Sequence, residues 1–74
     1  MKTLRELGFS KEWEHDNRYV WRSYDYRGGS LAIYFYTDRQ TWDTNGWVGM
    51  GSEIALAILL ECIQLGWISF EGGI

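Results

Sequence analysis

The sequence predicts an α+β domain: a curved antiparallel sheet of three to four strands, with a short N-terminal helix and a long apolar C-terminal helix. Residues 52–65 contain no Gly or Pro and are rich in Ala, Leu, Glu and Gln, which favour helices. Residues 18–27 and 30–37 are rich in aromatic and β-branched residues, which favour strands. A chain of 74 residues is the size of one small domain, so we expect residues 1–74 to form a single unit.

The first element expected is a helix of about two turns over residues 1–7, because Leu4 and Leu7 lie three positions apart and Gly8 follows as a stop. Residues 9–14 then alternate between the two faces of an extended chain, which predicts an edge strand. An isolated helix this short is unstable in water, so it must pack against the rest of the domain.

A hairpin is predicted in the middle of the chain, because Gly28 and Gly29 can supply the positive φ angles of a two-residue turn. With that turn, Tyr24 lies opposite Ile33, and the register decides which residues share a face. The face expected to pack against the long helix carries Tyr24, Tyr26, Leu31, Ile33 and Phe35. The opposite face carries Trp21, Ser23, Asp25, Ala32, Tyr34 and Tyr36.

That second face is unusually aromatic for a solvated sheet surface. Either the N-terminal helix or a partner subunit covers it, or it is a recognition surface. We predict Trp21, Tyr34 and Tyr36 as partner-binding residues, since Trp and Tyr are enriched at protein contacts. A short fourth strand is expected over residues 41–44.

The glycine-rich loop at residues 46–51 precedes the long helix, where backbone N–H groups can bind an anion. The loop lacks the Lys-Ser/Thr ending of a P-loop, and its glycine spacing differs from the dinucleotide-binding fingerprint. A phosphate site is therefore not favoured.

The long helix is expected to begin with Ser52 as N-cap and to end before Gly66 at the C′ position. Its predicted apolar arc consists of Ile54, Ala55, Ile58, Leu59, Cys62, Ile63 and Leu65. Its predicted polar edge consists of Glu53, Ala57, Glu61 and Gln64. Leu56 and Leu60 fall beside that edge, so we predict them as a self-association surface of a homodimer or small homo-oligomer. The alternative is a core helix covered on every side.

Composition excludes several function classes. The net charge is −3, from seven basic and ten acidic residues, which argues against binding to a phosphate backbone. The helix is too short for a bilayer, which needs about twenty apolar residues, so we expect no membrane partner. One cysteine allows no intrachain disulfide, and no signal peptide is visible, so we expect a cytoplasmic protein in which Cys62 is a small buried hydrophobe.

No catalytic or metal site is predicted. The single histidine, His15, lies between Glu14 and Asp16, but on a strand its side chain would point away from the neighbouring carboxylates. No Ser-His-acid or Cys-His pattern is apparent. We therefore expect a protein without enzymatic activity and without a cofactor.

Four segments carry a resemblance: LRELGF at 4–9, YVWRSYDYR at 19–27, LAIYFY at 31–36 and ECIQLGW at 61–67. In this layout the chain resembles small phage and prophage accessory proteins, most of which are uncharacterised. The resemblance implies a protein in the host bacterial cytoplasm that binds and blocks a host protein, as some inhibitors of bacterial immunity do.

The resulting hypothesis is a small acidic protein-binding module that blocks a host protein sterically. One alternative is an oligomer that binds a nucleotide-like ligand in an aromatic cage of Trp21, Tyr34, Tyr36 and Trp47. Another is a structural component of a larger assembly. A DNA mimic fits less well, because the basic residues offset most of the acidic charge.

Overall fold

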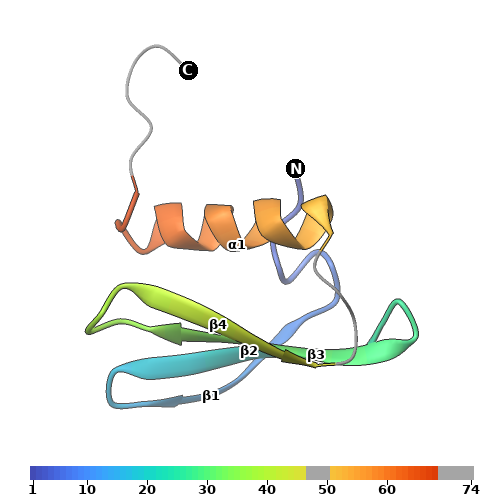
Figure 1. The fold of residues 1–74 in the computed structure, drawn as a ribbon, viewed down its shortest axis with the longest axis horizontal. Coiled ribbons are helices and arrows are strands. Elements are labelled where there is room, and N and C mark those ends of the chain that lie inside the picture. The colour runs from blue at the N-terminus through green and yellow to red at the C-terminus, as the bar shows by residue number, and fades with distance from the viewer. Residues whose placement is uncertain (47–50, 69–74) are drawn as a thin grey trace.

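The computed structural model describes residues 1–46 and 51–68 and shows a four-stranded antiparallel sheet with a helix over one face (Figure 1). In chain order the elements are β1 (Ser10–His15), β2 (Arg18–Tyr26), β3 (Gly29–Tyr36), β4 (Thr41–Gly46) and α1 (Ser52–Gln64). The sheet order is β1-β2-β3-β4, so each strand pairs with its neighbour in sequence. This meander needs only short turns between strands.

The predicted fold class is wrong in both of its helices. Residues 4–8 form a turn instead of an N-terminal helix, and the helix of the described residues lies after the strands. That helix, α1, has 13 residues and is not the long apolar helix that the sequence predicted. Its fully buried residues are Ile54, Ala57, Ile58 and Cys62.

The N-terminal turn contains a capping box without a helix behind it. The Thr3 N–H donates to Glu6 Oε1 at 2.8 Å, and the Glu6 N–H donates to Thr3 Oγ1 at 3.2 Å. Gly8 has a φ of 97°, a left-handed conformation that prevents the turn from continuing as a helix. The segment stays ordered because Leu4 and Phe9 are buried at one end of the core.

The β2–β3 hairpin turns one residue earlier than predicted. Arg27 and Gly28 carry the positive φ angles, 54° and 80°, and Tyr26 pairs with Gly29. A β-bulge between Ser23 and Tyr26 then shifts the register again.

This register sets the faces of the sheet. Trp21 pairs with Ile33, and Tyr19 pairs with Phe35. Because side chains alternate along a strand, these four residues share the face that α1 covers. We call this the inner face.

The core lies between the inner face and α1. Its residues are Leu4, Phe9, Tyr19, Trp21, Tyr26, Leu31, Ile33, Phe35, Ile54, Ala57, Ile58 and Cys62. The rings of Tyr19 and Phe35 stack with centroids 5.3 Å apart, and Phe9 packs against Tyr26 at 5.4 Å. Aromatic pairs of this kind contribute about 0.5–1.5 kcal/mol beyond the area they bury. A small core therefore gains much of its packing from rings.

The C-terminal end of α1 agrees with the sequence. Gly66 has a φ of 81°, its N–H donates to the carbonyl of Ile63, and the Trp67 N–H donates to the carbonyl of Cys62, each at 3.0 Å. These bonds form a Schellman motif, which confirms Gly66 at C′. The N-terminal prediction is wrong by one residue, because Gly51 is the N-cap.

The orientation of α1 about its axis differs from the prediction. Ala57 and Glu61, assigned to a polar edge, lie on the buried side, whereas Ala55, assigned to the apolar arc, is exposed. The reason is chemical: the inner face offers hydrogen-bond donors to the Glu61 carboxylate, so a glutamate can face the sheet.

The two sides of α1 should respond differently to truncation. Ile54 is 0 % exposed and Leu56 is 41 % exposed. We expect Ile54→Ala to lower the free energy of unfolding by about 2–5 kcal/mol, because it leaves a cavity in the core. Leu56→Ala should cost about 0.5 kcal/mol or less. Urea denaturation of both variants measures the difference, and equal losses would contradict the observed orientation of α1.

Candidate functional site

The sheet face opposite α1, which we call the outer face, interleaves aromatic and arginine side chains. It carries Trp13, Arg18, Arg22, Tyr24, Tyr34 and Tyr36, with Arg39 reaching over it from the β3–β4 turn. The strand register places these residues together: Val20 pairs with both Trp13 and Tyr34. Val20 is consequently buried beneath the outer face although it lies away from α1.

Each arginine of the outer face lies over an aromatic ring. The guanidinium carbon of Arg39 is 4.6 Å from the centroid of Tyr36, and that of Arg18 is 5.2 Å from Trp13. The third pair, Arg22 over Tyr24, is at 5.7 Å. The rings of Trp13 and Tyr34 are themselves 6.2 Å apart. The outer face therefore combines one aromatic pair with three arginine–ring contacts.

The arginines differ in their carboxylate partners. Arg22 forms a close ion pair with Glu12, with Nε and Oε1 2.9 Å apart. Arg39 and Asp38 are 3.9 Å apart, at the limit of an ion pair. Within the described residues Arg18 forms no ion pair. Arg18 therefore keeps its N–H donors available for an outside carboxylate.

A hollow of about 400 Å³ lies where the outer face meets the β1–β2 and β3–β4 turns. Its walls are formed by His15, Asp16, Asn17, Arg18, Tyr36, Asp38 and Arg39. His15 pairs with Asp16 at 3.1 Å, and no group of three potential metal ligands occurs within residues 1–46 and 51–68. The hollow is a recess in the outer face with cationic and anionic groups on its rim.

The predicted partner-binding residues do not all share this face. Tyr34 and Tyr36 lie on the outer face, but Trp21 lies on the inner face and is buried. The placement of Trp21 on this face is wrong because of the bulge between Ser23 and Tyr26, which shifts the register by one residue and so exchanges the faces of the strand before it. The predicted cage of Trp21, Tyr34 and Tyr36 therefore does not form. Its fourth member, Trp47, lies outside the described residues, as do residues 47–50 of the glycine-rich loop.

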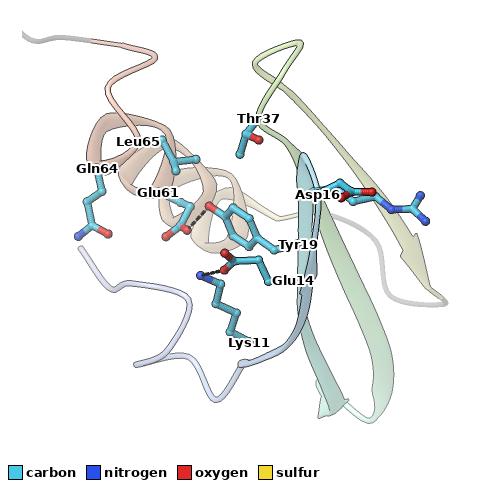
Figure 2. Close-up of a pocket in the computed structure, with 9 residues that line it drawn as sticks. Lys11, Glu14, Asp16, Tyr19, Thr37, Glu61, Gln64 and Leu65 are labelled. Carbon is cyan, nitrogen blue, oxygen red and sulfur yellow. Dashed lines mark hydrogen bonds and ion pairs between the residues drawn. The ribbon is translucent and has the colours of Figure 1, made fainter.

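A second site lies on the inner side, in a groove between the β1–β2 edge and the C-terminal half of α1 (Figure 2). The groove has a volume of about 330 Å³ and is lined by Lys11, Glu14, Asp16, Arg18, Tyr19, Thr37, Glu61, Gln64 and Leu65. Its floor is a hydrogen-bonded cluster. The Tyr19 hydroxyl donates to Glu61 Oε2 at 2.6 Å, and the Trp21 Nε1–H donates to the same oxygen at 3.2 Å. We call it the cation groove, because Lys11 places its ammonium there.

Lys11 is held by two contacts. Its Nζ lies 4.4 Å from the centroid of the Tyr19 ring and 2.9 Å from Glu14 Oε1. The bulge between Lys11 and Trp13 sends the two side chains to opposite faces, with Lys11 toward α1 and Trp13 outward.

The Tyr19 hydroxyl and the Cys62 thiol have raised pKa values. Burial and the neighbouring Glu61 carboxylate raise the pKa of Tyr19 well above its ordinary value, so its hydroxyl keeps its proton at neutral pH. Burial likewise raises the pKa of the Cys62 thiol, which lies in the core as predicted.

The predicted self-association residues lie on the far side of α1 from the sheet. Leu56 is exposed and Leu60 is half-buried. Leu59 and Ile63 are also half-buried, which gives the four residues the i, i+3, i+4, i+7 spacing of one helix face. Self-association through this face stays a prediction.

Sequence reasoning missed Trp13, Arg18 and Arg39 on the outer face. A signal was present in the sequence, because Trp13 and Arg18 lie on either side of a predicted turn. In the hairpin Trp13 pairs with Val20 and His15 pairs with Arg18, so alternation places Trp13 and Arg18 on the same face. The position of Glu61 had no such signal, since its partners lie about forty residues away.

Comparisons with family models, characterised proteins and solved structures gave no match for this chain. In the described part of the chain, no helix has the length and apolar character needed to cross a membrane.

Alkaline pH should reveal the Tyr19–Glu61 contact. Above about pH 10 the unfolded chain loses the Tyr19 proton while the folded chain keeps it, so the free energy of unfolding falls as pH rises. Phenylalanine has no proton to lose, so the free energy of unfolding of Tyr19→Phe should fall less steeply with pH. The slope should differ from that of the unmodified protein by up to about 1.4 kcal/mol per pH unit. Urea denaturation between pH 8 and 11 measures the slope.

The control is Tyr36→Phe, which removes a hydroxyl that makes no hydrogen bond to a described residue. It should leave the slope as in the unmodified protein. An unchanged slope in Tyr19→Phe would show that the Tyr19 hydroxyl ionises as freely in the folded chain as in the unfolded one.

Proposed function

We propose that this protein is a non-catalytic protein-binding module that contacts its partner through the outer face. The observation that carries the proposal is the pairing of three arginines with aromatic rings on one sheet surface. Trp, Tyr and Arg are the residue types that contribute most to binding energy at protein interfaces. A solvated sheet face without a partner would normally present short polar and charged side chains instead.

The outer face should lose little conformational entropy when a partner binds. Arg18, Arg22 and Arg39 are already placed over rings, so fewer rotamers must be fixed when a partner binds. The Trp13 and Tyr34 rings are packed together over buried Val20, which holds both in place. The outer face is thus organised before binding.

The partner that fits is a protein segment with carboxylates beside apolar side chains. A guanidinium that lies over a ring still directs its N–H groups sideways, where they can form bidentate bonds with a carboxylate. Arg18 has no ion-pair partner within the described residues, and Asp38 is a distant partner for Arg39. The half-buried rings of Trp13, Tyr34 and Tyr36 would contact the apolar side chains of the partner.

Blockade of a host protein by a phage-encoded module is the finer form of this proposal. It is supported by the sequence resemblance and by the aromatic and arginine side chains that share the outer face. A module that binds through one such face covers a surface of its partner, which is how steric inhibitors work.

A peptide display library tests the proposal without a known partner. Selection of random twelve-residue peptides on the immobilised protein should enrich sequences with Asp or Glu next to an aromatic or aliphatic residue. We expect Arg18→Gln together with Arg39→Gln to weaken the enriched peptides roughly tenfold, about 1.4 kcal/mol. Isothermal titration measures the affinities.

The matched control is the variant Arg27→Gln, which removes the same charge from the β2–β3 turn, where Arg27 lies over the inner-face residue Tyr26. It should retain full affinity. Equal weakening by Arg27→Gln, or no enrichment from the library, would overturn the proposal. Salt-sensitive binding of a single-stranded oligonucleotide to the outer face would replace it with a nucleic-acid function.

A further inference from the structure

We propose that the cation groove is a binding site for an organic cation, an ammonium or guanidinium group that takes the place of the Lys11 ammonium. The ring and the carboxylates that define the site lie on the inner side of the molecule, although Asp16 and Arg18 also line the hollow in the outer face. Its binding would not depend on the protein partner proposed above.

The first argument is the aromatic platform. The Tyr19 ring stacks with Phe35, with centroids 5.3 Å apart, and Lys11 Nζ lies 4.4 Å from the Tyr19 centroid. The Tyr19 hydroxyl is anchored to Glu61 at 2.6 Å. A ring that is fixed by a hydrogen bond and by stacking, that lines a groove and that already has an ammonium over it, is the central part of a cation–π site.

The second argument is the arrangement of carboxylates around that ring. Glu14 and Glu61 lie beside the Tyr19 ring, whereas Asp16, which also lines the groove, lies across the strand from that ring and pairs with His15 (Figure 2). Both hydrogen bonds to Glu61 end on Oε2, so Oε1 accepts none from the described residues. A cation over the Tyr19 ring therefore has more acceptor oxygens within the groove than Lys11 uses, since Lys11 pairs with Glu14.

The third argument is charge balance. The groove-lining residues carry three carboxylates and two cations, Lys11 and Arg18. Arg18 lies over Trp13 on the outer face, so Lys11 is the lining cation that lies beside Glu14 and over the Tyr19 ring. Removal of Lys11 would leave a carboxylate-lined aromatic site without its cation.

The last argument is that Lys11 can be displaced. The Lys11 side chain is 39 % exposed and its ion pair with Glu14 is a surface contact, which contributes at most about 1 kcal/mol. The groove volume of about 330 Å³ is larger than one ammonium group requires. Lys11 thus acts as a tethered competitor that weakens binding of an outside cation.

The test is a titration with methylguanidinium chloride against sodium chloride of equal ionic strength, followed by NMR shifts of the Tyr19 ring. We expect Lys11→Ala to bind the probe roughly tenfold more tightly than the unmodified protein, because the competitor is gone. Addition of Glu14→Gln to Lys11→Ala should remove most of that gain.

The control variant is Lys2→Ala, which removes the other lysine of the chain and with it the same charge. It should bind like the unmodified protein. Two results would overturn the proposal: no saturable shift in Lys11→Ala beyond the sodium chloride reference, or equal gains in Lys2→Ala and Lys11→Ala. Matching amide spectra verify that each variant is folded.

A second probe distinguishes the source of the cation. An arginine in the middle of a blocked tripeptide should bind more tightly than methylguanidinium if the groove takes a side chain from a partner protein. Equal affinities of the two probes would support a small free cation. Both results support binding of an organic cation in the groove. They differ in whether that cation belongs to a partner protein or is a free small molecule.

Discussion

The half-buried carboxylate of Glu61 is the contact that fixes the helix on the sheet. Its Oε2 accepts hydrogen bonds from Tyr19 and Trp21, both on β2. At the other end of α1, Glu53 accepts a bond of 2.9 Å from Tyr26, also on β2. Loss of such donors would leave a carboxylate desolvated without compensation, which costs about 1–3 kcal/mol or more. One strand thus sets the position of the helix along the sheet.

The bulge in β2 makes this arrangement possible. Tyr19 and Trp21 share the inner face by ordinary alternation, but Tyr26 would fall on the outer face without the extra residue between Ser23 and Tyr26. The same bulge leaves Tyr24 outside, where Arg22 lies over its ring. Hydroxyl and indole donors are therefore directed to the helix, while the arginines of β2 are directed outward.

The two candidate sites follow from this division of the β2 side chains between the inner and outer faces. The outer face gains an aromatic surface with arginines because alternation places Arg18 and Arg22 on the side away from α1. The cation groove forms because Glu61 draws α1 toward Tyr19, and the bulge in β1 directs Lys11 onto the same ring. Both sites thus depend on strand register more than on any local motif.

The strand positions and the end of the helix could be predicted from the sequence, because they depend on local composition and on Gly66. The register could not. It depends on a positive φ at Arg27, which a Gly-Gly pair at 28–29 obscures, and on a bulge without a sequence signal. That error placed Trp21 on the wrong face.

The predictions of the two helices were wrong for a related reason. Thr3 and Glu6 do form the capping box of a helix start, but Gly8 limits it to one turn. The many apolar residues of α1 predicted a wide buried arc without Glu61. In the structure Glu61 faces the sheet, because Tyr19 and Trp21, about forty residues away, donate hydrogen bonds to its carboxylate. Burial of a charged residue depends on its partners, and those partners are known only from the tertiary fold.

A double-mutant cycle between Tyr19 and Glu61 tests the account most directly. The free energy of unfolding would be measured in urea for Tyr19→Phe, for Glu61→Met and for the double variant. If the carboxylate fixes α1 through this hydrogen bond, the coupling energy should be about 1 kcal/mol or more. A coupling energy within about 0.3 kcal/mol of zero would show that the two residues stabilise the fold independently, and would contradict the account.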